Sequence, residues 1–148
     1  MHTLRVFFDT SVLISGSFSR SGASFVLLQL AGLSLIEGRI SALVREDAQR
    51  NVQSKVPAAL PALRVLLDEA LAEGPIVTLE ALDRVRAYAH AKDVPILASA
   101  VAQECRYLVT LNERDFHPPA ALIRVARPGE MLGAMRSLLA SFEIAAKD

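Results

Sequence analysis

Acidic residues stand at the ends of hydrophobic segments in this chain of 148 residues. Asp9 follows the apolar run of residues 6–8 in VFFDTSVLISG, and Asp115 follows a second apolar run in LVTLNERDF. Asp93 precedes the apolar stretch of KDVPILASA. Burial disfavours a charged carboxylate unless hydrogen bonds or a positive charge compensate it. Asp9 is therefore either a helix cap or a side chain held at the edge of a sheet for chemistry.

The elements that must position these acids alternate between two hydrophobic patterns. Short continuous apolar runs predict strands that are buried on both faces, at residues 4–8, 33–36, 76–79, 107–111 and 122–125. The longer segments predict helices at residues 24–31, 41–55, 62–73, 81–91, 95–105 and 128–142. Strands that alternate with helices are typical of a parallel sheet covered on both faces. We therefore expect one α/β domain over residues 1–148, with three layers (α/β/α) and a central, mostly parallel five-stranded sheet.

Composition and charge exclude several classes of protein. Hydrophobic residues make up 52% of the chain and aromatic residues 5%, so the expected core is aliphatic. Sixteen basic residues balance sixteen acidic ones, and a polyanion must therefore be held by local patches or by a metal ion. The single cysteine, Cys105, excludes an internal disulfide. No apolar stretch reaches the roughly 18 residues of a membrane span, which predicts a soluble, cytoplasmic protein.

The acids come together if the strand order is 3-2-1-4-5. Sites in open α/β sheets lie at the carboxyl ends of strands, where the strand order reverses. Asp9 after the first strand and Asp115 after the fourth are then neighbours. Asp93 reaches the same crevice from the helix that feeds strand four, and Glu46 reaches it from the helix after strand two. Clustered carboxylates call for a hard divalent cation, so we predict a site for Mg²⁺ or Mn²⁺.

Each of these acids also has a purely structural interpretation. Asp9 suits a turn or a helix cap, Asp93 suits the first turn of a helix, and Asp115 suits a polar loop. On a helical wheel Asp47 lies between apolar residues and competes with Glu46 for the inward position. No single acid decides between the interpretations, and the prediction rests on their joint placement.

Four segments resemble the PIN domain family: FDTSVLISG, the S-x4-E pair of Ser41 and Glu46, KDVPILASA and LVTLNERDF. They occur in this order over residues 6–128. The most specific part is the pairing of D-x-P-[IL]-L-x-x-A with L-V-T-x-N-x-x-D-F. The resemblance implies a metal-dependent endoribonuclease, often the toxin of a toxin–antitoxin pair. It also implies a small antitoxin protein as partner, and a homodimer.

The resemblance assigns roles to individual residues. The family's acidic quartet, which would hold the metal and carry catalysis, corresponds to Asp9, Glu46, Asp93 and Asp115, and the S-x4-E register selects Glu46 over Asp47. Asn112 stands where many members carry another aspartate. Thr10 or Ser11 would form hydrogen bonds within the site, and Thr110 would orient the loop after the fourth strand.

The chemistry of such a site fits RNA hydrolysis. A bound Mg²⁺ lowers the pKa of a water molecule and offsets charge on the leaving oxygen, so no nucleophilic side chain is needed. Ser11 is therefore a supporting residue, because no histidine stands near it in the sequence. Basic residues beside the acids are candidates for binding the RNA substrate: Arg45, Arg50, Lys92 and Arg114.

Two other classes of protein are alternatives to the metal-dependent nuclease. A haloacid-dehalogenase-like phosphatase needs a second aspartate two residues after the first, and position 11 is serine. A non-catalytic RNA- or partner-binding module on the same fold stays an alternative, with Asn112 marking a weakened site. Cleavage of mixed RNA by the purified protein, with a chelator as control, discriminates the alternative from the nuclease.

Overall fold

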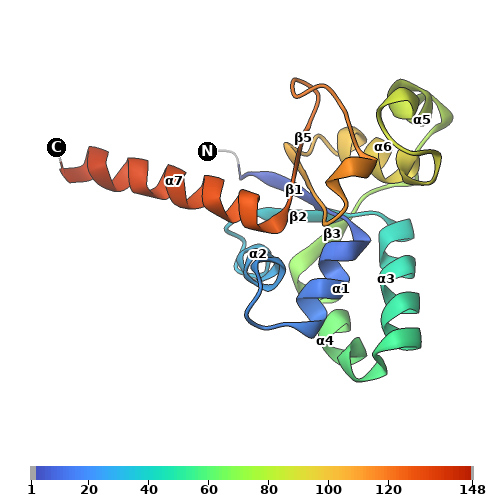
Figure 1. The fold of residues 1–148 in the computed structure, drawn as a ribbon, viewed down its shortest axis with the longest axis horizontal. Helices are drawn as coiled ribbons and strands as arrows, with labels where there is room; N and C mark the ends of the chain where they lie inside the picture. The colour runs from blue at the N-terminus through green and yellow to red at the C-terminus, as the bar shows by residue number, and fades with distance from the viewer. Residues whose placement is uncertain (1–2, 148) are drawn as a thin grey trace.

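Five parallel strands form the sheet at the centre of the molecule (Figure 1). The computed structural model of the chain describes residues 3–147. The strand order is β3-β2-β1-β4-β5, which confirms the predicted order. The strands are β1 Arg5–Phe8, β2 Glu37–Ile40, β3 Leu71–Glu73, β4 Tyr107–Val109 and β5 Arg124–Ala126. Since β1 pairs with both β2 and β4, the strand order reverses beside β1, where α/β folds place their sites.

Helices cover both faces of this sheet. They are α1 Thr10–Phe18, α2 Ala23–Gly32, α3 Ala42–Lys55, α4 Leu60–Val65, α5 Leu79–Val85, α6 Val94–Ala102 and α7 Pro128–Lys147. The helix α1 contacts α2, α3 and α4, whereas α5 contacts α6, and Figure 1 shows these two groups on opposite sides of the strands. The predicted α/β/α layering is therefore confirmed. Most predicted helices overlap observed ones, with ends that differ by a few residues.

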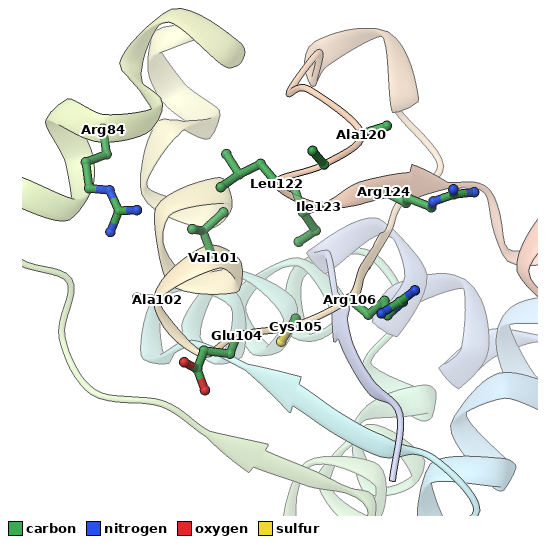
Figure 2. Close-up of a pocket in the computed structure, with 11 residues that line it drawn as sticks. Arg84, Val101, Ala102, Glu104, Cys105, Arg106, Ala120, Leu122, Ile123 and Arg124 are labelled. Atoms are coloured by element: carbon green, nitrogen blue, oxygen red, sulfur yellow. The ribbon is translucent and has the colours of Figure 1, made fainter. Parts of the chain in front are cut away.

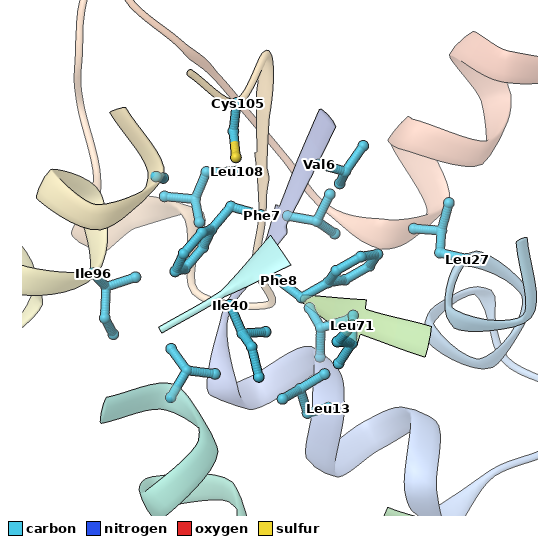
Figure 3. Packing of buried hydrophobic residues seen from close by; sticks show 14 of the residues in the cluster. Val6, Phe7, Phe8, Leu13, Leu27, Ile40, Leu71, Ile96, Cys105 and Leu108 are labelled. Atoms are coloured by element: carbon cyan, nitrogen blue, oxygen red, sulfur yellow. The ribbon is translucent and has the colours of Figure 1, made fainter. Parts of the chain in front are cut away.

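The central strand β1 is buried on both faces because its side chains alternate between two apolar layers. Val6, Phe7 and Phe8 have no exposed surface. Figure 3 shows the Phe7 ring on the side of Ile96 in α6 and the Phe8 ring on the side of Leu27 in α2. Alternate side chains of a strand point to opposite faces, so one short run anchors both helical layers.

The predicted positions of the second and third strands were wrong. The second strand is β2 at Glu37–Ile40 instead of the predicted residues 33–36. Leu33 and Leu35 lie in the turn after α2 and are 70% and 63% exposed. The third strand is β3 at Leu71–Glu73 instead of the predicted residues 76–79, where Ile76 is 91% exposed. The helix predicted at 62–73 ends at Ala70, and β3 begins at the next residue, Leu71. Apolar residues exposed in connecting segments mimicked buried strands in the sequence.

The sequence did not predict the helix α1, which begins directly after Asp9. The Asp9 carboxylate accepts a hydrogen bond of 2.8 Å from the Thr10 backbone N–H and is the N-cap of α1. Val12, Leu13 and Gly16 are buried in this helix. The cap interpretation of Asp9 is therefore confirmed, and it fixes the direction in which the chain leaves β1.

The last helix, α7, is only partly packed on the body of the molecule. Met131 and Leu132 are buried near its start, where α7 contacts α2. Leu138 and Leu139 are 58% and 64% exposed, and Figure 1 shows the helix projecting away from the sheet.

No single helix among residues 3–147 has the length and apolar character to cross a membrane; α1 and α2, bent by 97°, reach that length and composition only as a pair.

Candidate active site

The Asp9 side chain lies at the carboxyl end of β1 and is only 6% exposed. Besides the Thr10 N–H, it accepts hydrogen bonds from two hydroxyl groups. The Thr110 Oγ1 donates to Asp9 Oδ2 at 2.7 Å, and the Ser11 Oγ donates to the same oxygen at 3.2 Å. The carboxylate is therefore held in one orientation by residues that follow two neighbouring strands, β1 and β4.

The loop after β4 is tied to Asp9 through the same two hydroxyl groups. The Asn112 backbone N–H donates to Thr110 Oγ1 at 3.0 Å, and the Leu111 N–H donates to Ser11 Oγ at 3.1 Å. Thr110 is fully buried, whereas the Asn112 side chain is exposed. Ser11 thus forms the hydrogen bond predicted for Thr10 or Ser11, Thr10 contributes its backbone N–H, and Thr110 binds the loop that it was predicted to orient. The Thr10 hydroxyl is buried and has no hydrogen-bond partner among the described residues.

Three aspartates meet at this edge of the sheet. Burial raises the pKa of Asp9 above its usual 3.8, hydrogen bonds from Thr110, Thr10 and Ser11 lower it, and the charge of Asp115 raises it. Burial also raises the pKa of Asp93, Lys92 lowers it, and Asp115 and Asp9 raise it. The charges of Asp9, Asp93 and Asp115 thus act on one another, and their joint binding of a cation stays a prediction.

One oxygen of the Asp93 carboxylate lacks a partner. Asp93 Oδ2 is buried and accepts no hydrogen bond from the described part of the chain. A buried polar atom without a partner is costly unless a ligand satisfies it. Asp93 lies at the start of α6, after the short helical turn η4 Ala91–Asp93.

Two residues near the acids were missed in the sequence. His90 lies 3.7 Å from Asp115 between Nε2 and Oδ1, and its backbone N–H donates to the Asp115 carbonyl at 3.1 Å. Its position three residues before Asp93 was the available signal. The Arg127 guanidinium donates to the Leu111 carbonyl at 3.0 Å. Nothing in the sequence indicates that contact, since it depends on β5 lying beside β4.

Glu46 and Asp47, the two candidates on α3, have different surroundings. Glu46 lines a cavity of about 290 Å³ together with Pro95, two residues after Asp93. Asp47 accepts a hydrogen bond of 3.1 Å from Arg50 and is not among the residues that line this cavity. None of the three aspartates lines this cavity, so the choice of Glu46 over Asp47 stays a prediction.

The four predicted RNA-binding residues fall into two groups. Arg45 forms ion pairs with Glu73 at 2.8 Å and Asp68 at 3.5 Å, and Arg50 pairs with Asp47. Their charges are already balanced within the fold. Lys92 and Arg114 are exposed and form no salt bridge with the described residues, so they are the better placed candidates.

Residues 5–114 match the sequence model of the PIN domain. The chain belongs to the PIN domain family. The match covers the strands β1 to β4 and most of the site described above, including Asp9, Glu46 and Asp93. Asp115 is the residue directly after its end. No match is found among curated protein sequences.

Solved structures share this PIN domain fold at low sequence identity. VapBC2 from Rickettsia felis, bound to a DNA fragment from its promoter, is 16% identical with a TM-score of 0.64 over 84% of this chain and 98% of that one. DNA-bound VapBC from Salmonella typhimurium is 15% identical with a TM-score of 0.65 over 85% and 99%. VapC20 from Mycobacterium tuberculosis, a toxin that cleaves the sarcin-ricin loop, is 13% identical with a TM-score of 0.51 over 70% and 86%. At these identities the comparison shows the fold alone.

The carboxylates of this PIN domain have the chemistry that a divalent cation needs, but they are not arranged around one point. Oxygen donors with raised pKa values and the unpartnered Asp93 Oδ2 are what a hard cation would compensate. However, no group of three or more His, Cys, Asp or Glu side chains in residues 3–147 is arranged to hold a metal ion. The aspartates must therefore move closer or change rotamer to share one cation.

The raised pKa values of the PIN domain predict a pH dependence of stability in chelator. Because Asp9 and Asp93 have folded-state pKa values above 3.8, the folded chain binds more protons than the unfolded chain at pH values just above 3.8. Their contribution to the free energy of unfolding is fully present below pH 3.8 and is lost as the pH rises through the folded values. We expect metal-free parent protein to gain stability relative to an Asp9→Asn/Asp93→Asn variant as the pH falls from neutrality toward 3.8.

Urea unfolding of both proteins over a series of pH values in this range measures the difference. Other acids titrate in both proteins and cancel in the comparison. An equal change in parent and variant would show that the two aspartates are not electrostatically strained in the folded state.

Proposed function

We propose that this PIN domain is a metal-dependent endoribonuclease that hydrolyses RNA phosphodiester bonds in the cytoplasm. The proposal is carried by the placement of Asp9 after β1 and Asp115 after β4, with the charges of both acting on Asp93, whose buried Oδ2 lacks a partner. Such repulsion is costly and marks a functional site when it lies at the edge where α/β folds bind ligands.

Asp9, Asp93 and Asp115 would hold Mg²⁺ or Mn²⁺, with Glu46 completing the set from α3. The bound ion would supply Lewis-acid activation of the phosphodiester and of the attacking water. The chain's own residues orient the carboxylates: Thr110 and Ser11 fix the Asp9 oxygen through their hydroxyl groups. Ser11 is not a nucleophile in this proposal, since its Oγ is engaged by Asp9 and by the Leu111 N–H.

The exposed cations next to the acids would bind the RNA. Lys92 adjoins Asp93, and Arg114 adjoins Asp115. Arginine and lysine neutralise phosphates on either side of the cleaved bond without reading the base sequence. Their placement beside the acids keeps the positive charge local in a chain whose net charge is zero.

The test is cleavage of single-stranded RNA by the purified protein with Mg²⁺ or Mn²⁺, against the same protein in chelator. Asp93→Asn is expected to lose the activity. Asp83→Asn is the matched control, because Asp83 pairs with Arg86 on the exposed face of α5. Absence of metal-dependent cleavage by well-folded parent protein would contradict the proposal. RNA binding without cleavage would instead support the alternative, a non-catalytic RNA- or partner-binding module in which the exposed Asn112 reflects a weakened site.

A small antitoxin protein and a second copy of the chain are the proposed partners. The structural neighbours from Rickettsia felis and Salmonella typhimurium are VapBC assemblies. The chain also exposes large apolar side chains that a partner could cover, at Leu33 and Leu35 after α2 and at Leu138 and Leu139 on α7. Light scattering of the isolated chain, and copurification with the product of the adjacent reading frame, test the two partners separately.

Removing the Thr110 hydroxyl is expected to reduce RNA cleavage by about tenfold, within the 10–100-fold range typical for groups that orient metal ligands. Thr110→Val loses the bonds to Asp9 Oδ2 and to the Asn112 N–H at nearly constant volume. Thr110→Ser keeps the hydroxyl and is the control for packing. Cleavage rates of the three proteins at saturating Mg²⁺ give the result; a serine variant as weak as the valine variant would assign Thr110 to packing alone.

A further inference from the structure

A second cavity, of about 730 Å³, lies at the edge of the sheet opposite the three aspartates. It is bounded by the end of α6, the turn into β4 and the loop that leads into β5 (Figure 2). Arg106 directly precedes β4, and Arg124 is the first residue of β5. The cavity is therefore at the amino ends of these strands, whereas Asp9 and Thr110 are at carboxyl ends.

Arginines from three different segments line this cavity. Figure 2 shows Arg84 of α5 on one side, and Arg106 and Arg124 next to each other on the other side. Within residues 3–147, none of the three forms a salt bridge or a side-chain hydrogen bond that would fix it to the fold. Glu104 is the acid among the lining residues. Three guanidinium groups against one carboxylate leave the cavity positively charged in a chain of zero net charge.

The same edge of the sheet carries further positive charge. Arg5 and Arg39 both pair with Glu37, at 3.1 and 3.2 Å, so one carboxylate serves two guanidinium groups. The amino ends of the strands therefore carry more arginine than the nearby carboxylates neutralise. Guanidinium groups match phosphate oxygens in geometry and in charge.

The wall between the arginines is apolar and continues toward the aspartates. Val101 and Leu122 line this cavity and also line a neighbouring one of about 380 Å³, to which Tyr88 contributes. The Tyr88 carbonyl accepts a hydrogen bond of 2.8 Å from the His117 N–H, two residues after Asp115. The two cavities together are called the arginine groove below, comprising Arg84, Arg106, Arg124, Val101, Leu122 and Tyr88.

We propose that the arginine groove binds the backbone of single-stranded RNA, as a second contact for the strand whose cleaved bond lies at Asp9. This rests on the proposed nuclease function. A positive groove with apolar and aromatic surface suits single strands, since phosphates take the cations and bases stack on the flat side chains. From Arg106 to Thr110 along β4 is roughly 13 Å at about 3.3 Å per residue. Because Leu108 and Val109 of β4 are fully buried, an RNA that contacts both ends of the sheet must run over the surface and be longer than this straight distance.

The experiment measures binding of a fluorescent single-stranded RNA in chelator, where no cleavage occurs. The groove variant is Arg84→Gln/Arg106→Gln/Arg124→Gln. The control variant is Arg20→Gln/Arg64→Gln/Arg136→Gln, which removes the same charge from exposed positions outside the groove. We expect the groove variant to bind at least about tenfold more weakly than the control. The slope of log affinity against log salt is expected to decrease by about 2, from three contacts at roughly 0.7 each.

Three results would overturn the groove: parent-like affinity in the groove variant, an equal loss in the control, or displacement of the RNA by polyglutamate at a similar concentration. The last would show a site for an acidic protein partner. If the triple variant melts lower than the parent, Arg124→Gln alone must still give about a third of the change in slope. A parent that binds RNA through these arginines but cleaves nothing contradicts the nuclease function and leaves the groove standing.

Discussion

Asp9→Asn is expected to reduce RNA cleavage by more than about 100-fold, beyond the range typical of groups that merely orient a metal ligand. The substitution keeps the shape of the side chain and one acceptor for the Thr10 N–H, but it removes the charge that would bind the cation. When the oxygen of the new amide faces the Thr10 N–H, its nitrogen takes the place of Asp9 Oδ2. That oxygen accepts the hydrogen bonds of the Thr110 and Ser11 hydroxyl groups in the parent. The activity is therefore lost while α1 keeps its cap.

The same variant is expected to fold at least as stably as the parent in chelator. Burial and the charge of Asp115 both raise the pKa of Asp9, and these effects outweigh its three hydrogen bonds. Ionised Asp9 is therefore strained at neutral pH, and a neutral side chain relieves the strain. Parent protein should gain about 2.7 kcal/mol from Mg²⁺ at a hundredfold excess over the dissociation constant, and the variant should lose most of that gain.

Thermal melts of both proteins with and without Mg²⁺ separate this role from capping. Loss of a cap typically costs about 1 kcal/mol and does not alter a response to metal. A variant that melts lower than the parent in chelator, yet keeps the full Mg²⁺ shift, would make Asp9 purely structural. Asp83→Asn is again the control for loss of an aspartate elsewhere.

Asp9 and Asp115 could be singled out in the sequence because they follow β1 and β4, which are buried on both faces. Val6, Phe7 and Phe8 leave no polar position, so an acid after such a run stands out. By contrast, β2 reads EGRI, and its charged residues survive at the edge of the core because Glu37 pairs with Arg39 and Arg5. A strand stabilised by such pairing has no apolar signature in the sequence.

The contacts that orient the site depend on tertiary structure and could not be predicted. The Ser11 hydroxyl meets the Leu111 N–H, and Arg127 reaches the Leu111 carbonyl, only because β1, β4 and β5 are neighbours. The His90 contact with Asp115 requires the bridge between Ala89 and Phe116. Residue types and spacing thus singled out the candidate acids, whereas the hydrogen bonds around Asp9 are set by the packing of loops.

Glu46→Gln is expected to reduce RNA cleavage by about 100-fold or more, whereas Asp47→Asn keeps most of the activity. Glu46 shares a cavity with Pro95, which lies at the start of α6, two residues after Asp93. Asp47 points its charge at Arg50, which is 70% exposed. Loss of that exposed pair costs at most about 0.5 kcal/mol of stability, so Asp47→Asn is a matched control one residue away.

The two variants are compared by cleavage rate and by the Mg²⁺ concentration needed for half of the thermal shift. In the proposed site Glu46 is the ligand that comes from α3. An additional carboxylate ligand lowers the Mg²⁺ concentration needed for half of the thermal shift. Glu46→Gln should therefore raise that concentration, while Asp47→Asn should leave it unchanged. The opposite ranking would mean that the helix presents Asp47 to the cation when the aspartates draw together. The ion pair with Arg50 would then be the resting state of a catalytic side chain.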